Sequence, residues 1–291
     1  MSLVEPIALL LVAAYVLVRA RLATGYHPLL ARLGLLAIAS WVGEESAIRA
    51  YGFYHYAPCW RLVVGHVPLA VVLIWPAVIH SAWDTGRCLL GRPLVDTEGP
   101  TAAPSGAGQR RRDRLVPLAG AALVFADAWL IEPLSVQAGL WSWSEPGLFG
   151  VPPIGVVGWA AHAGLCMAVL EQSARRRLGA SGEASMIVLA PLGLHALLLG
   201  SWWGALRWMS GELSPWPAVA AAWLASLLLT GWALRAGARR RIPPLAMWAR
   251  VPPTLFFLAL LALRARDAPA LWAWAFAFAP PYLTLTRWPT R

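Results

Sequence analysis

Residues 151–170 read VPPIGVVGWAAHAGLCMAVL, a stretch without one Asp, Glu, Lys or Arg. Its length matches the roughly 20 residues that a helix needs to cross the hydrocarbon core of a bilayer. A membrane barrel strand would alternate apolar and polar residues, and this stretch does not. Because a spanning helix satisfies all its backbone hydrogen bonds internally, the stretch predicts a transmembrane helix.

The rest of the chain repeats this pattern. The sequence is 59% hydrophobic and 13% charged, whereas soluble domains carry about 25% charged residues. We therefore expect an all-α fold, a polytopic transmembrane bundle of about eight or nine helices. It would form a single membrane domain over residues 1–291, with its C-terminal transmembrane helices at 184–286. The other apolar runs are Leu3–Val18, Leu29–Val42, Leu62–Trp83, Leu115–Ile131, Ala184–Leu206, Pro215–Leu234, Val251–Leu263 and Ala268–Leu285. Two of these runs, Leu29–Val42 and Val251–Leu263, are short for a full span, so they should tilt, extend into flanking residues or lie at the interface.

Positive charge is concentrated between the apolar runs. All 24 basic residues are Arg and the net charge is +10. The clusters near residues 19–32, 87–114, 175–177 and 235–241 fall on one side of the membrane if every run spans it. The positive-inside bias makes that side cytoplasmic, with residues 84–114 as a cytoplasmic linker. We expect a multi-pass protein of the bacterial inner (plasma) membrane, and no nucleic-acid partner, because the arginines do not form one soluble basic face.

Two segments, 29–83 and 115–170, share an internal pattern. In each, a Glu precedes a Gly by seven residues, and the Gly starts a Gly-x-aromatic-x-aromatic motif. The pairs are Glu45 with Gly52, Tyr54 and Tyr56, and Glu132 with Gly139, Trp141 and Trp143. Both motifs lie between an outgoing and a returning span, so they should meet on one membrane face. We predict a pseudo-repeat of two helical hairpins with a cleft between its halves.

Four acidic residues at the ends of apolar runs are the candidate catalytic groups: Glu44, Glu45, Asp127 and Glu132. An ionisable group at membrane depth is costly, which makes it a functional candidate. Burial favours the protonated carboxyl, and two neighbouring carboxyls titrate at different pH. Such a pair would provide an acid beside a base. The alternative, a solvated or helix-capping role, stays open, above all for Glu44.

Aromatic residues recur at fixed distances from these acids. Their faces can stabilise a positive charge, although simple anchoring at the membrane interface explains them equally well. The candidate substrate-binding residues are Tyr54, Tyr56, Trp75, Trp129, Trp141, Trp143, Trp159 and His66. The scattered histidines and cysteines match no common metal motif, and no P-loop or dinucleotide-binding motif is present. We expect no metal and no cofactor.

The residues from Trp41 to Trp159 resemble those of the integral-membrane carotenoid hydratases, of the gamma-carotene 1'-hydratase and bisanhydrobacterioruberin hydratase type. The more specific block is Asp127-x-Trp129-x-x-Glu132-Pro133 with Gly139-x-Trp141-x-Trp143. The resemblance implies a lipophilic polyene substrate in membrane lipid, with other carotenoid-pathway enzymes as further partners. It implies a cofactor-independent hydro-lyase that protonates a terminal C=C and adds water to the tertiary carbocation. Asp127 and Glu132 would be the acid–base pair, with Glu45 next and the aromatic residues facing the cation.

Three alternatives remain at this stage. A carotenoid or terpenoid cyclase would use the same acid and cation but exclude water, so that an internal double bond captures the cation. A proton-coupled transporter would also suit a repeat with intramembrane acids. A structural partner of another pigment enzyme would need no chemistry.

Overall fold

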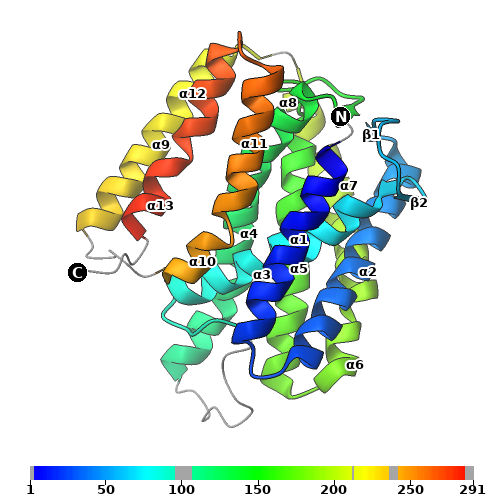
Figure 1. Ribbon diagram of the computed structural model, residues 1–291, viewed down its shortest axis with the longest axis vertical. Helices are drawn as coiled ribbons and strands as arrows, with labels where there is room; N and C mark the ends of the chain where they lie inside the picture. The colour runs from blue at the N-terminus through cyan, green and yellow to red at the C-terminus, as the bar shows by residue number, and fades with distance from the viewer. Residues whose placement is uncertain (1–2, 96–106, 212, 236–241, 286–291) are drawn as a thin grey trace.

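The computed structural model describes residues 3–95, 107–211, 213–235 and 242–285 (Figure 1). Most of this part of the chain is helical, and the strands are only two or three residues long. The predicted fold class, an all-α bundle of membrane-type helices, is confirmed.

The helices fall into two groups along the chain. The first group forms the larger part of the bundle; in the second, α12 and α13 pack on α9, and α11 packs on α4 (Figure 1). The first group is α1 (Val4–Leu22), α2 (Tyr26–Tyr51), α3 (Leu69–Leu89), α4 (Ala107–Gln137), α5 (Pro153–Arg176), α6 (Gly179–Ala184), α7 (Met186–Ser201), the π-helical turn η1 (Trp202–Leu206) and α8 (Arg207–Met209). The second is α9 (Pro215–Arg235), α10 (Pro244–Trp248), α11 (Val251–Arg264), α12 (Pro269–Ala277) and α13 (Ala279–Leu285).

Two short antiparallel strand pairs lie at one end of the bundle. Strand β1 (Tyr54–Tyr56) pairs with β4 (Trp141–Trp143), and β2 (Val63–Val64) pairs with β3 (Val67–Pro68). The first pair joins the two repeated motifs directly, in a register that sets Tyr54 opposite Trp143 and Tyr56 opposite Trp141. The two motifs therefore meet on the same end of the bundle.

Glycines in the left-handed conformation end the helices that lead into the motifs. Gly52 follows α2 with φ 61°, and Gly139 follows α4 with φ 70°. A residue with a Cβ pays a steric penalty in this region, so Gly at these two positions allows each helix to stop and the chain to turn into its strand. Helices α3 and α5 then begin after Pro68 and Pro152, residues that suit a helix start because they lack an N–H.

Small residues let the central helices approach closely. A Cβ added to Gly86 of α3 would lie 3.2 Å from the backbone nitrogen of Gly120 in α4. A Cβ on Gly164 of α5 would lie 3.0 Å from that of Ala121 in α4. Close backbone contact through glycine is the usual way in which membrane helices associate, because lipid provides no hydrophobic drive between them. Helices α3, α4 and α5 form a tight centre that fixes the loops above them.

Five of the described helical segments are long and apolar enough to cross a membrane: Leu69–Leu89, Asp113–Gln137, Pro153–Arg176, Gly179–Met209 and Pro215–Arg235. Helices α1, α3, α5 and α9 each carry Arg in the last turn. In Figure 1 α1 and α5 end near the bottom and α9 ends lower left, all away from the β1 strand and the N-terminus. The chain is a membrane protein with one arginine-rich end.

Several boundaries differ from the sequence-based expectation. The run Leu62–Trp83 begins with the β2–β3 hairpin, and its helix starts only at Leu69. The short run at 29–42 extends in both directions into the 26-residue helix α2, whereas the last run breaks into α12 and α13. Within the predicted linker 84–114, α3 continues to Leu89 and α4 starts at Ala107, and residues 96–106 lie outside the described part. So does residue 286, the end of the predicted C-terminal helices.

The cysteines provide a test of orientation. Cys59 is exposed in the loop at the motif end, whereas Cys88 and Cys166 are buried. We expect a membrane-impermeant thiol reagent to label Cys59 in intact cells, because the positive-inside bias puts the arginine-rich end in the cytoplasm. A Cys59→Ser variant controls for the buried thiols. Labelling only in inverted vesicles would reverse the orientation.

Candidate functional site

A cavity of about 510 Å³ lies inside the bundle and reaches from the paired strands toward the arginine-rich end. Most of its lining is apolar or aromatic, which is typical of a pocket for a lipophilic ligand. Four carboxyl side chains also line it: Glu44, Asp84, Asp127 and Glu132. Three of these four are among the candidate acids chosen from the sequence.

Glu132 lies in the last two turns of α4, 2% exposed, and accepts hydrogen bonds from indole groups. The Nε1 atoms of Trp141 and Trp143 donate to Oε2 at 2.7 and 2.9 Å. Trp159 of α5 also hydrogen-bonds this carboxyl. Strand alternation puts residues i and i+2 on one face, so the spacing Trp-x-Trp lets both indoles of β4 point at one acid.

Glu44 of α2 occupies the matching place beneath the other strand. The Nε1 atom of Trp75 donates to its Oε1 at 2.8 Å, and the hydroxyls of Tyr54 and Tyr56 donate to its Oε2. Trp75 and Trp159 each follow a proline by seven residues at the start of their helices. The two cradles are therefore built from equivalent parts of the repeat, each with one helical acid, two strand aromatics and one Trp.

The aromatic side chains of the two cradles pack against one another across the strand pair. The ring centroids of Tyr54 and Trp143 are 4.8 Å apart, and those of Tyr56 and Trp141 are 5.8 Å apart. Trp75 and Trp159 approach to 4.6 Å. All six line the cavity, so they form one aromatic wall around both carboxyls.

The tyrosine hydroxyls are held as donors. Burial raises the pKa of Tyr54 well above its ordinary value, and the negative charge of Glu44 raises it further. The pKa of Tyr56 is raised in the same direction by burial, then by Glu44 and by Glu132. Both hydroxyls thus stay protonated, and the charges of Glu44 and Glu132 both contribute to the raised pKa of each tyrosine.

Glu45 and His66 lie outside the cavity lining. The Glu45 carboxylate accepts a hydrogen bond from Arg49 at 2.6 Å and from the His66 backbone N–H at 2.7 Å, and it contacts His66 Nδ1 at 2.9 Å. A Cβ on Gly65, which has φ 68°, would lie 2.6 Å from this carboxylate. These contacts fasten the β2–β3 turn to α2. Equal sequence spacing pairs Glu45 with Glu132, but in space the counterpart of Glu132 is Glu44.

Asp127 lines the cavity but forms an ion pair with Arg250, at the start of α11. Trp129 lies outside the lining and packs its ring against Trp274 of α12 at 5.7 Å. Its carbonyl accepts the Trp274 indole N–H at 2.7 Å. That carbonyl is available because Pro133, four residues later, has no N–H to donate.

His162 of α5 lines the cavity and was not chosen from the sequence. Its Nε2 lies 3.1 Å from the Ser40 hydroxyl. Its Nδ1 is buried without a hydrogen-bond partner in the described part of the chain. The ring lies against Gly43, the residue that precedes Glu44 in α2. A Cβ added to Gly43 would be 3.3 Å from Nδ1. A lone His in an apolar run carries no signal by which the sequence could have singled it out.

Within the described residues, no group of three or more His, Cys, Asp or Glu side chains is arranged to hold a metal ion. The acids and histidines near the cavity are instead engaged with aromatic donors, arginines or hydroxyls.

The model of the family described as carotenoid biosynthesis protein matches residues 4–228. The chain belongs to the carotenoid biosynthesis protein family. The match extends beyond the block Trp41–Trp159 that carries the resemblance in sequence, through α7 and into α9. Comparisons with curated proteins and with solved structures find no significant match. Family membership means that the chain takes part in carotenoid biosynthesis, and the apolar helices and cavity fit a lipophilic carotenoid substrate.

Two glycines of α5 test whether Trp143 must keep its place in this carotenoid biosynthesis protein. A Cβ on Gly155 would lie 2.5 Å from the Trp143 ring, whereas a Cβ on Gly158 would meet only Leu198 Cδ2 at 3.5 Å. Gly155→Ala should displace the indole from Glu132 and lower carotenoid conversion by about tenfold or more, because small misplacements at a reacting site are costly. Gly158→Ala is the matched control and should keep its activity.

Conversion is measured in pigment extracts and normalised to the amount of protein in the membrane. Equal activity of the two alanine variants would show that the position of Trp143 does not matter.

Proposed function

We propose that the protein is a carotenoid hydratase, which adds water to the terminal C=C of an acyclic carotenoid end group. The observation that supports this most is the placement of Glu44 and Glu132 beneath paired strands in one apolar, aromatic cavity. Two buried carboxyls that share a site resist losing both protons, because like charges in a poorly solvated space repel. One carboxyl then serves as an acid and the other as a base.

The first step is protonation of the alkene. The protonated carboxyl transfers its proton to the less substituted carbon of the terminal double bond, and the electron pair of that bond forms the new C–H bond. A tertiary carbocation remains on the neighbouring carbon. The wall of Tyr54, Tyr56, Trp141 and Trp143, with Trp75 and Trp159, would stabilise this cation through the aromatic faces.

The second step is addition of water. The oxygen of a water molecule forms a bond to the cationic carbon while the ionised carboxylate accepts one of its protons. The product is a tertiary alcohol. One proton has left the pair and one has returned to it, so the two carboxyls together hold the same number of protons as before. In this scheme no redox change occurs and no cofactor is consumed.

The unpartnered Nδ1 of His162 supports hydration over cyclisation. A buried polar atom without a partner costs free energy unless water satisfies it, and a water needs several polar partners to stay in an apolar cavity. The ring of His162 lies 5.3 Å from that of Trp75, a donor to Glu44, and His162 and the two tyrosine hydroxyls provide such partners in the cavity lining. A cyclase would need the same cavity without these polar partners for water.

Asp127 has a different place in this proposal from the one implied by the sequence resemblance. Its carboxylate is paired with Arg250 at the start of α11 and has no place in the two cradles of aromatic donors. We therefore assign the acid–base pair to Glu44 and Glu132, and a role in shaping the cavity to Asp127.

Expression in a lycopene-producing bacterium tests the proposal. We expect extracted pigment to gain the mass of water, and Glu44→Gln and Glu132→Gln each to lower conversion by about a hundredfold or more, as loss of a general acid or base does. Glu45→Gln is the matched control: the neighbouring carboxyl lies outside the cavity, and its variant should stay active.

An isomeric product would identify a cyclase instead. Unchanged pigment in cells with correctly inserted protein would contradict hydration of lycopene. Full activity of Glu44→Gln together with loss of activity in Glu45→Gln would assign the acid–base role to Glu45 instead of Glu44.

A further inference from the structure

The cavity continues from the two carboxyls toward the arginine-rich end, between α1 and α11. One face of α1 lines it at a helical spacing, through Val4, Ala8, Leu11, Val12, Tyr15 and Val18. The N-terminal half of α11 lines it from the other side. Figure 1 shows α1 and α11 as neighbours at the front of the bundle. Helix α1 packs on α3, whereas α11 packs on α4, so neither main packing contact joins α1 to α11.

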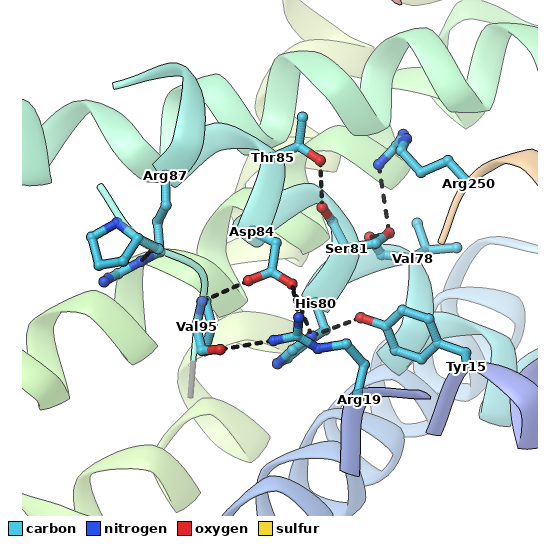
Figure 2. Close-up of polar contacts among 11 residues, drawn as sticks. Tyr15, Arg19, Val78, His80, Ser81, Asp84, Thr85, Arg87, Val95 and Arg250 are labelled. Carbon is cyan, nitrogen blue, oxygen red and sulfur yellow. Dashed lines mark hydrogen bonds and ion pairs between the residues drawn. The ribbon is translucent and has the colours of Figure 1, made fainter. Parts of the chain in front are cut away.

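A buried polar network closes the arginine-rich end of the cavity (Figure 2). Arg19 is 2% exposed, pairs with Asp84 at 3.1 Å and donates to the Val95 carbonyl at 2.7 Å. Asp84 accepts the Val95 backbone N–H at 2.6 Å. Beside it, the Tyr15 hydroxyl and His80 Nδ1 are 2.7 Å apart. Breaking a buried ion pair of this kind costs several kcal/mol, so an apolar chain cannot continue through this floor.

A second ion pair completes the floor. Arg250 pairs with Asp127 and lies 3.5 Å from the Ser81 hydroxyl. Its guanidinium carbon also lies 5.6 Å from the centre of the Tyr282 ring of α13. These contacts tie α4, α3 and α13 together at the level of the α11 start. On the α13 side of α11, Leu283 also lines the cavity and is 60% exposed.

The lining reaches the surface above this floor. Val18 and Leu255 both line the cavity, yet they are 45% and 59% exposed. A side chain that lines a cavity and is also half exposed marks an opening. The α1 surface beside it is apolar: Leu17 is 63% exposed. In a membrane protein such a surface faces lipid, so this opening is a mouth toward the bilayer.

We propose that the polyene enters the cavity through this mouth between α1 and α11. When it is bound, its reacting end lies at Glu44 and Glu132, and the rest of its chain extends through the mouth into lipid on the arginine-rich half of the bilayer. This inference rests on the proposed function. Because the polar floor blocks a straight path, the chain leaves sideways between Val18 and Leu255, where α1 and α11 both line the cavity. The protein then recognises only one end of a linear polyene, and the chemical structure of the other end does not affect binding.

One consequence concerns substrates with two reactive ends. Each acyclic end has to enter in a separate binding event, since the far end stays in lipid. A substrate with two acyclic ends should therefore release a singly modified product before the doubly modified one. A polyene with one acyclic end and one ring should react at a comparable rate.

Tryptophan substitutions in the mouth test the inference. Leu255→Trp and Val18→Trp place a large ring where the chain would lie. Leu263→Trp and Leu10→Trp are matched controls, because these residues are 68% exposed and do not line the cavity. Leu283→Trp probes the opposite side of α11, where a lining residue is 60% exposed.

The protein is purified from lycopene-producing cells, and bound polyene is measured by its visible absorption, independently of any chemical change. We expect the two mouth variants to retain about tenfold less polyene, which corresponds to about 1.4 kcal/mol, because the indole ring occupies the path of the chain. The two control variants should bind as the unmodified protein does. Normal binding in the mouth variants, loss in Leu283→Trp alone, or no bound polyene in the unmodified protein would each overturn the inference.

The readout separates this inference from the proposed function. If the unmodified protein binds lycopene without changing it and the mouth variants lose this binding, the mouth is supported and hydration of lycopene is refuted. Hydrated product with unaffected mouth variants would keep the hydratase and refute the mouth.

Discussion

The antiparallel contact between residues 54–56 and 141–143 is the interaction on which the site depends. It joins the ends of α2 and α4 and sets their two carboxyls beneath one aromatic wall. Two three-residue strands are too short to be stable alone. Flanking bonds extend the ladder: Ser144 donates to the Phe53 carbonyl at 2.7 Å, and Ala57 donates to the Leu140 carbonyl at 3.0 Å. The tilted and edge-to-face contacts between the rings and the tight packing of α3, α4 and α5 hold the strands in place.

The free-energy cost of each acid in the cavity depends on the donors that surround it. A carboxyl inside an apolar bundle is costly unless several donors reach it, and here each acid receives three, all from indole or phenol groups. These donors satisfy the acids without adding a positive charge that would fix them as carboxylates. The acids farther along the cavity differ, since Asp84 and Asp127 are each paired with an arginine. The same cavity thus has one end where the acids are held by neutral aromatic donors and another end where they form ion pairs with arginines.

The sequence was sufficient for the fold class and for the meeting of the two motifs. Runs such as Val151–Leu170 could only be spanning helices, and the Glu-to-Gly spacing indicated a repeat on one face. It was not sufficient to distinguish Glu44 from Glu45, which differ by about 100° around the helix. Pro133 follows Glu132 in α4 but has no counterpart after Glu45 in α2, and a proline alters the path of its helix. Equal spacing therefore did not give equal orientation.

Other parts of the site depend on contacts between residues distant in the chain, for which local patterns carry no information. Arg250 lies 123 residues from Asp127, and nothing near either residue indicates the other. The β2–β3 hairpin was hidden inside an apolar run because its valines suit a strand and a membrane helix alike. The unpartnered nitrogen of His162 is visible only when the surrounding helices are placed.

The most direct measurement of the central claim is a disulfide between the two motifs. His55 and Ser142 are register partners in the strand pair, and both side chains are exposed. In a Cys59→Ser background, His55→Cys with Ser142→Cys should form an intramolecular disulfide under mild oxidation, because directly opposed strand residues lie within disulfide distance. The account predicts efficient bond formation with carotenoid conversion retained. No bond would contradict the pairing on which the two-carboxyl site is built. A bond that abolishes conversion in folded protein would contradict the claim that the site works with its strands paired.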